Sequence, residues 1–247
     1  MTDYAIEQCS RAGLRAYDYG ASVNNTISRV YYGLYGSCSV LVESTGIAIG
    51  KDHFERRVFS QHTAVKALLD RVYENADSIK DMVSSARSSI IAKGAKFDSS
   101  NRFILKHGMS YKNGYILPRP SFNIDGTVAD AAKTGTYYKY DTALKSRALP
   151  TAYIIPKTAS KAAGAVRKLE QNGISYFEIA PGSRLTARQF SGTASKTVLK
   201  DAAAVTFSKG AYVIPMNQAG AKVIAACLEP DVKDTAGYKG SFVQSGL

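Results

Sequence analysis

The sequence predicts an α/β chain whose C-terminal part holds a small parallel sheet covered by helices. Two nearly identical pentapeptides carry this prediction, Ala152–Pro156 (AYIIP) and Ala211–Pro215 (AYVIP). Both are rich in the β-branched and aromatic residues that favour strands. Each is followed by a segment with apolar residues at helical spacing. Strands that alternate with helices are typical of parallel sheets, because the helix returns the chain to the same end of the sheet.

Residues 1–93 are predicted to be mainly helical, with one buried strand. Residues 3–15 suit a short amphipathic helix, and Ser37–Glu43 (SCSVLVE) has the length and apolar character of a buried strand that ends on a carboxylate. Asp52 is predicted to cap a long helix, and residues 76–92 to form a second one. The apolar residues of the long helix recur at helical spacing and are expected to form its buried stripe: Phe54, Val58, Val65, Leu69 and Val72.

Residues 94–150 have a different character. Short β-like runs alternate there with Gly, Asn, Pro and Asp, which predicts an irregular, strand-rich connector. Residues 151–247 are predicted to be a C-terminal α/β domain. Its first helix is expected to end at Asn172 and Gly173, before a strand over 174–179, and residues 221–228 are expected to form its last helix.

The composition narrows the possible functions. The formal charge is +12, but the basic residues are dispersed and match no nucleic-acid-binding motif, so no specific nucleic-acid partner is expected. Three cysteines, Cys9, Cys38 and Cys227, are too few for a disulfide framework and are expected to be reduced and mostly buried. The N-terminus lacks a signal-peptide pattern and no apolar run approaches the roughly 20 residues that a membrane span needs. We therefore expect a soluble chain with no membrane partner, and the compartment of the parent protein stays open.

Several motifs in the first part of the chain occur in a characteristic order. Asn25–Arg29 (NTISR), Tyr32–Gly36 (YGLYG) and Ser39–Gly46 (SVLVESTG) follow one another, and His53–Val58 (HFERRV) opens the long helix. In this order they resemble the end of the catalytic domain of carboxypeptidase A-like zinc peptidases, particularly bacterial members with a further C-terminal region. Leu228–Asp231 (LEPD) and the segments around the two AY(I/V)IP strands are similar to that region, an amidotransferase-like α/β extension.

The resemblance implies that residues 1–93 are the last part of a carboxypeptidase catalytic domain. It matches Glu43 to the family's catalytic glutamate, which accepts a proton from zinc-bound water and passes it to the leaving amine. Zinc lowers the pKa of its bound water towards about 7, so a nearby carboxylate can generate hydroxide at neutral pH. The implied activity of the intact enzyme is hydrolysis of C-terminal peptide bonds, or trimming of peptides such as cell-wall stems, with one Zn²⁺.

The sequence departs from the family pattern at the metal site. The family's zinc ligands, an HxxE motif and a second histidine, lie upstream of the catalytic glutamate. The three histidines here, His53, His62 and His107, all follow Glu43, and none has an acidic residue three positions later. We therefore expect no zinc site and no activity in this chain alone. The substrate-binding arginines are not located either, and Thr45 stands where the family often has an arginine.

Other interpretations remain open. The C-terminal α/β domain could be a non-catalytic module that binds a polyanion or a protein partner, as the charge of +12 and the sixteen tyrosines allow. The chain could also assemble with a separate chain that supplies the missing half, in which case it should expose a large apolar face. A nucleophilic pair of Cys38 and His62 is formally possible, and Tyr32 is interpreted as a packing residue.

Overall fold

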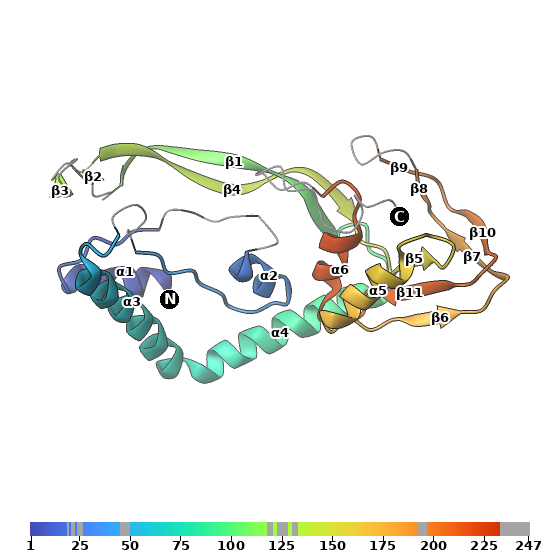
Figure 1. Ribbon diagram of the computed structural model, residues 1–247, viewed down its shortest axis with the longest axis horizontal. Helices are drawn as coiled ribbons and strands as arrows, with labels where there is room; N and C mark the ends of the chain where they lie inside the picture. The colour runs from blue at the N-terminus through green and yellow to red at the C-terminus, as the bar shows by residue number, and fades with distance from the viewer. Residues whose placement is uncertain are drawn as a thin grey trace. The chain divides into compact units, whose positions relative to one another are not determined.

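The computed structural model describes residues 1–18, 20, 23, 27–44, 50–117, 121–122, 128–129, 133–191 and 197–232. Between residues 111 and 141 it describes the backbone alone. The predicted mixed α/β class is confirmed (Figure 1). The chain divides into two compact units. Unit 1 is built from Met1–Ser22, Ser39–Met82 and Met109–Asp141, and unit 2 from Val23–Cys38, Val83–Gly108 and Thr142–Leu247. The predicted division at residues 93 and 150 stays a prediction.

Unit 1 is organised around the contact of two helices, α1 (Thr2–Arg11) and α3 (Phe54–Glu74). The contact buries small side chains on both sides, with Ala5 and Cys9 on α1 and Ala64 and Ala67 on α3. Small residues allow two helices to approach closely. The predicted first helix was extended four residues too far at its C-terminal end, because the chain turns at Ala12 and at Gly13, where φ is +74°.

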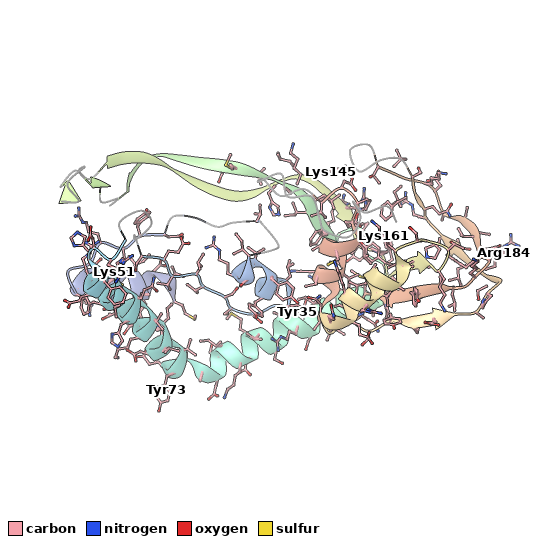
Figure 2. All side chains as sticks on the ribbon, viewed as in Figure 1. Tyr35, Lys51, Tyr73, Lys145, Lys161 and Arg184 are labelled. Carbon is pink, nitrogen blue, oxygen red and sulfur yellow. The ribbon has the colours of Figure 1, made fainter. Side chains whose placement is uncertain are left out.

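The predicted buried stripe of α3 is wrong for four of its five residues, whose side chains face solvent, while Val72 is half-buried. Leu69 is 62% exposed and Phe54 61% exposed, and Val58 and Val65 are exposed as well. At 100° per residue these four side chains lie roughly 140° around the helix from the Ala64 and Ala67 face that packs on α1. We call Phe54, Val58, Val65 and Leu69 the α3 stripe. Figure 2 shows that Tyr73, at the end of the same helix, also projects outwards.

Two further predictions in this region need correction. Residues 37–44 contain no strand, so the predicted strand Ser37–Glu43 is wrong. No described strand pairs with them, and an isolated extended segment cannot satisfy its backbone groups as a strand does. The N-cap of α3 is His53, one residue after the predicted Asp52, with a left-handed backbone at φ 54°. The second helix, α4 (Ala76–Ala95), was predicted with its end three residues early.

The predicted connector holds two long strands rather than short runs. β1 (Arg102–Leu117) and β4 (Lys133–Ala148) are 16 residues each and pair with one another. The short strands β2 (Ser121–Phe122) and β3 (Val128–Ala129) form an antiparallel pair. Glycine and polar residues interrupt the apolar runs without ending the strands.

Unit 2 contains a three-stranded sheet in the order β5–β11–β6, formed by β5 (Ala152–Pro156), β11 (Ala211–Pro215) and β6 (Phe177–Ile179). Both neighbours run antiparallel to β11, and Val213 lies opposite Ile154 on one side and Phe177 on the other. The predicted parallel sheet is therefore wrong for the described residues. β5 and β6 do point the same way, as a β–α–β unit requires, but β11 is inserted between them, so neither pairs with a parallel neighbour.

Two helices of unit 2 contribute to its apolar core. The helices α5 (Ala162–Gln171) and α6 (Ala221–Leu228) supply half of the buried core residues, and Leu169, Ile214 and Ile224 are fully buried in this core. The other elements are α2 (Ser28–Leu34), β7 (Ser183–Ala187), β8 (Phe190–Ser191), β9 (Val198–Leu199) and β10 (Ala203–Phe207). β7 pairs with β10 and β8 with β9, both antiparallel.

Gly94 allows the end of α4 to approach the chain directly after β11. A Cβ atom at Gly94 would lie 1.9 Å from the carbonyl oxygen of Met216, so the contact excludes any side chain. We expect Gly94→Ala to lower the free energy of unfolding by about 3 kcal/mol or more, because backbone must move to relieve the overlap. Urea unfolding measures this change.

Gly164 is the matched control, since it also lies within a helix but has open space around its Cβ position. Gly164→Ala should raise the free energy of unfolding by about 0.5–1 kcal/mol through helix propensity alone. Equal effects of the two substitutions would show that the contact of Gly94 with Met216 does not constrain the fold.

Candidate functional site

Glu43, the predicted catalytic carboxylate, is exposed and lies between two residues that are fixed to α3. The Gln61 amide donates a hydrogen bond of 3.1 Å to Ser44 Oγ and one of 3.4 Å to the carbonyl oxygen of Val42. Ser44 Oγ also lies 2.6 Å from Ser60 Oγ. These bonds hold the backbone on both sides of Glu43 while its own side chain stays accessible to solvent.

The segment around Glu43 lies against α3 between its α1-facing side and the α3 stripe. At 100° per residue, Ser60 falls on the α1-facing side and Gln61 between that side and the stripe. The neighbouring side chains of Val40 and Leu41 are 40% and 39% exposed. Glu43 is thus next to apolar surface that the described part of the chain leaves uncovered.

The three histidines do not gather around Glu43. His53 caps α3, His62 is exposed on the same helix, and His107 lies on β1 in unit 2. Burial lowers the pKa of His107, so this imidazole is neutral at pH 7. Among the described residues, no group of three or more His, Cys, Asp or Glu side chains could hold a metal ion. The residues described therefore do not fit a zinc ion.

The three cysteine thiols and the ring of Tyr32, the predicted packing residue, differ in their exposure to solvent. All three cysteines are free, but only Cys9 is buried, while Cys38 is exposed and Cys227 is intermediate. Burial raises the pKa of the Cys227 thiol to about 11, which disfavours a reactive thiolate. Cys38 belongs to unit 2 and His62 to unit 1. Tyr32 is 55% exposed, with its ring edge-to-face with Tyr31 at 5.5 Å.

A buried charge cluster in unit 2 was not predicted. The Arg147 guanidinium donates two hydrogen bonds of 2.9 Å to the Asp231 carboxylate and also pairs with Glu229. Tyr153 Oη donates to Glu229 Oε1 at 2.5 Å, and Lys145 Nζ donates to Asp231 Oδ2 at 2.5 Å. We call these five residues the Arg147 cluster. Both carboxylates come from the LEPD motif, whose pair of acids after an apolar helix was the available sequence signal.

The two carboxylates of the cluster are shifted in opposite directions. Burial raises the pKa of Glu229 above its ordinary value, although Tyr153 and Arg147 oppose the shift. Burial also acts to raise the pKa of Asp231, but the hydrogen bonds from Arg147 and Lys145 outweigh it and hold this pKa below its ordinary value. Because every charge in it is paired, the cluster fits a structural role that joins β4 to the chain after α6.

Comparisons with protein-family models, curated proteins and solved structures found no match. No helix within the described residues is long and apolar enough to cross a membrane.

We expect Arg147 to stabilise the folded state, because it pairs with two buried carboxylates. The side chain of Arg147 is 15% exposed and both carboxylates are buried, so Arg147→Met leaves Glu229 without a cation and Asp231 with Lys145 alone. The free energy of unfolding at pH 7 should fall by about 3–5 kcal/mol. Without the arginine, burial raises the carboxyl pKa of Glu229 further in the folded state, and only Lys145 still lowers that of Asp231. Folding then takes up protons, and the loss should become smaller as the pH falls from 7 to 4.

The triple substitution Arg147→Met, Glu229→Gln and Asp231→Asn provides the control, because it removes the charges together. It should recover most of the stability that the single substitution loses. Urea unfolding at several pH values measures both variants. A single-variant loss that does not change with pH would contradict the assignment of a buried Glu229 carboxylate that has lost its cation.

Proposed function

We propose that this chain contributes the C-terminal part of a zinc carboxypeptidase that hydrolyses C-terminal peptide bonds, with Glu43 as its catalytic carboxylate. The order of motifs from Asn25 to the start of α3 suggests the family. The supporting structural observation is the position of Glu43, exposed next to Val40 and Leu41 on an extended segment that has no strand partner among the described residues. The zinc ligands would come from protein outside the described residues.

Burial of the exposed α3 stripe would stabilise the association of this chain with a further part of the catalytic domain. Covering one large apolar side chain contributes about 1.5–3 kcal/mol, so the α3 stripe alone offers several kcal/mol to a surface that packs on it. Residues 40–42 are three successive apolar residues, and two of them, Val40 and Val42, are β-branched strand formers. A sheet that pairs with this segment would also satisfy its backbone groups. Both features fit the edge of a larger catalytic domain.

The chemistry assigned to this chain is proton transfer by one carboxylate. A general base needs a fixed position and access to the proton that it takes. The hydrogen bonds of Val42 and Ser44 to Gln61 supply the fixed position, and the exposure of Glu43 supplies the access. Glu43 can then accept a proton from water and return it to the amine that leaves the peptide. No step is assigned to zinc here, because the described residues do not fit it.

The first test measures zinc and peptidase activity. The chain purified alone should contain far less than one zinc per molecule and release no C-terminal amino acid. Joined at its N-terminus to the metal-binding segment of a carboxypeptidase A-like enzyme, it should bind one zinc and become active. Glu43→Gln should then lower kcat by about 100-fold or more with zinc content unchanged, because a positioned base contributes about 10²–10⁴-fold.

Glu55→Gln is the matched control, since Glu55 is an exposed glutamate in the first turn of α3. It should leave kcat unchanged. Equal activities of the Glu43 and Glu55 variants would exclude Glu43 as the catalytic base. One tightly held zinc in the chain alone would show that the ligands do not come from elsewhere.

The α3 stripe can be tested separately by substituting Val58 and Leu69 with lysine. Because both side chains are already exposed, the free energy of unfolding should change by no more than about 0.5 kcal/mol. Self-association in sedimentation velocity should decrease, because an exposed apolar face is removed. Ala67→Lys, at the buried contact with α1, should instead destabilise unit 1 by about 2 kcal/mol or more. A large loss of stability in the Val58 and Leu69 variant would show that the stripe is already covered.

A further inference from the structure

Unit 2 contains a pocket that the proposed peptidase activity does not use. Its volume is about 420 Å³, within the range of roughly 300–1,000 Å³ that is usual for small-molecule sites. It lies between the last turns of α4, the loop that follows and the start of α6. Part of its wall is apolar, formed by Ile90, Leu149 and the fully buried Met216.

The charged side chains of the pocket are predominantly positive. Lys93, Arg102 and Lys222 line it, against a single carboxylate, Asp98. Neither lysine has an ion-pair partner among the described residues. Lys222 belongs to the first turn of α6, where the helix dipole adds positive potential. A concave surface with this excess of cations attracts an anion.

Hydrogen bonds already fix the polar part of the pocket. Arg102 donates from Nε to Ser146 Oγ at 2.9 Å, from Nη2 to the Ser146 carbonyl oxygen at 2.8 Å, and from Nη1 to Ser99 at 3.4 Å. A guanidinium has five N–H donors, so two remain for a ligand. Asn101 donates to the carbonyl oxygen of Lys93 at 3.2 Å and joins the loop to the end of α4. Arg102 and the loop then need little ordering when a ligand binds.

We propose that this pocket binds a small ligand that carries an oxyanion, phosphate or carboxylate, next to a short apolar group. The two lysines and the free guanidinium donors face the oxyanion, and the hydroxyl of Ser89 supplies a further donor. The apolar wall contacts the rest of the ligand. This assignment does not depend on the peptidase proposal, since every residue in it belongs to unit 2.

The negative charge of Asp98 repels an anion in the pocket. Removing this charge therefore tests whether the ligand is an anion. The Asp98 carboxylate accepts a hydrogen bond of 2.8 Å from the backbone N–H of Ser100. The bonds from Ser100 hold the pKa of Asp98 below its ordinary value, so the group is ionised at pH 7. Asp98→Asn keeps an acceptor for Ser100 but removes the negative charge. It should tighten binding, whereas loss of a lysine should weaken it.

The experiment titrates the full chain with inorganic phosphate, n-butyl phosphate and n-butyrate, followed by amide chemical shifts in NMR spectra. We expect saturable shifts confined to residues around the pocket, with n-butyl phosphate or n-butyrate binding more tightly than inorganic phosphate. Lys93→Gln and Lys222→Gln should each weaken binding about tenfold, the effect of losing about 1.4 kcal/mol from one charged hydrogen bond.

The matched control is Lys209→Gln, an exposed lysine before the start of β11, whereas the pocket lies beyond its end. It makes the same change in net charge and should leave the affinity unchanged. Tighter binding of the phosphate ester identifies a phosphate ligand, and tighter binding of butyrate a carboxylate. The proposal is wrong if no ligand gives saturable shifts, or if Lys209→Gln weakens binding as much as Lys93→Gln.

Discussion

The central position of β11 in its sheet is the constraint on which unit 2 depends. This strand follows its two partners in the sequence, yet it pairs with both of them. Without β11, β5 and β6 have no common neighbour, and α5, which connects them, has no sheet to cover. Met216, the residue after β11, connects the sheet to α4. Its N–H donates a hydrogen bond of 2.9 Å to the carbonyl oxygen of Thr151, and its own carbonyl contacts Gly94 on α4. One late strand thus orders the sheet, the core helices and the wall of the pocket.

Local sequence patterns were sufficient to locate helices and strands, but they did not predict which strands pair with one another. The bounds of β5, β11 and α6 matched the sequence prediction, because each is a compact run of apolar residues with clear ends. The direction of pairing depends on residues far apart in the chain, and a β–α–β rhythm does not reveal that a later strand is inserted. Helical periodicity likewise located the apolar face of α3. It could not tell whether another part of the protein covers that face, and in the described structure none does.

The candidate sites differ in how much of each one could be predicted from the sequence. Glu43 was proposed from its motif, and the structure adds how Gln61 holds the backbone on either side of it. The Arg147 cluster has no comparable signal, because Arg147 lies 82 and 84 residues from its two carboxylate partners. Lys93, Arg102 and Lys222 are ordinary surface residues in the sequence. They become a group only because Gly94 lets α4 approach the end of β11.

The net charge of +12 does not by itself locate a binding surface, because paired and unpaired cations count equally in it. Arg147 is paired with two carboxylates, with the ring of Phe190 5.1 Å from its guanidinium carbon, so its charge is already neutralised within the fold. Its planar donors suit such a fixed, buried arrangement. The two pocket lysines are exposed and carry flexible, strongly hydrated charges, which suits a ligand that arrives from solvent. The surplus charge is therefore available where pairing is incomplete and the surface is concave. This favours a compact anion site in unit 2 over attraction spread evenly along the chain.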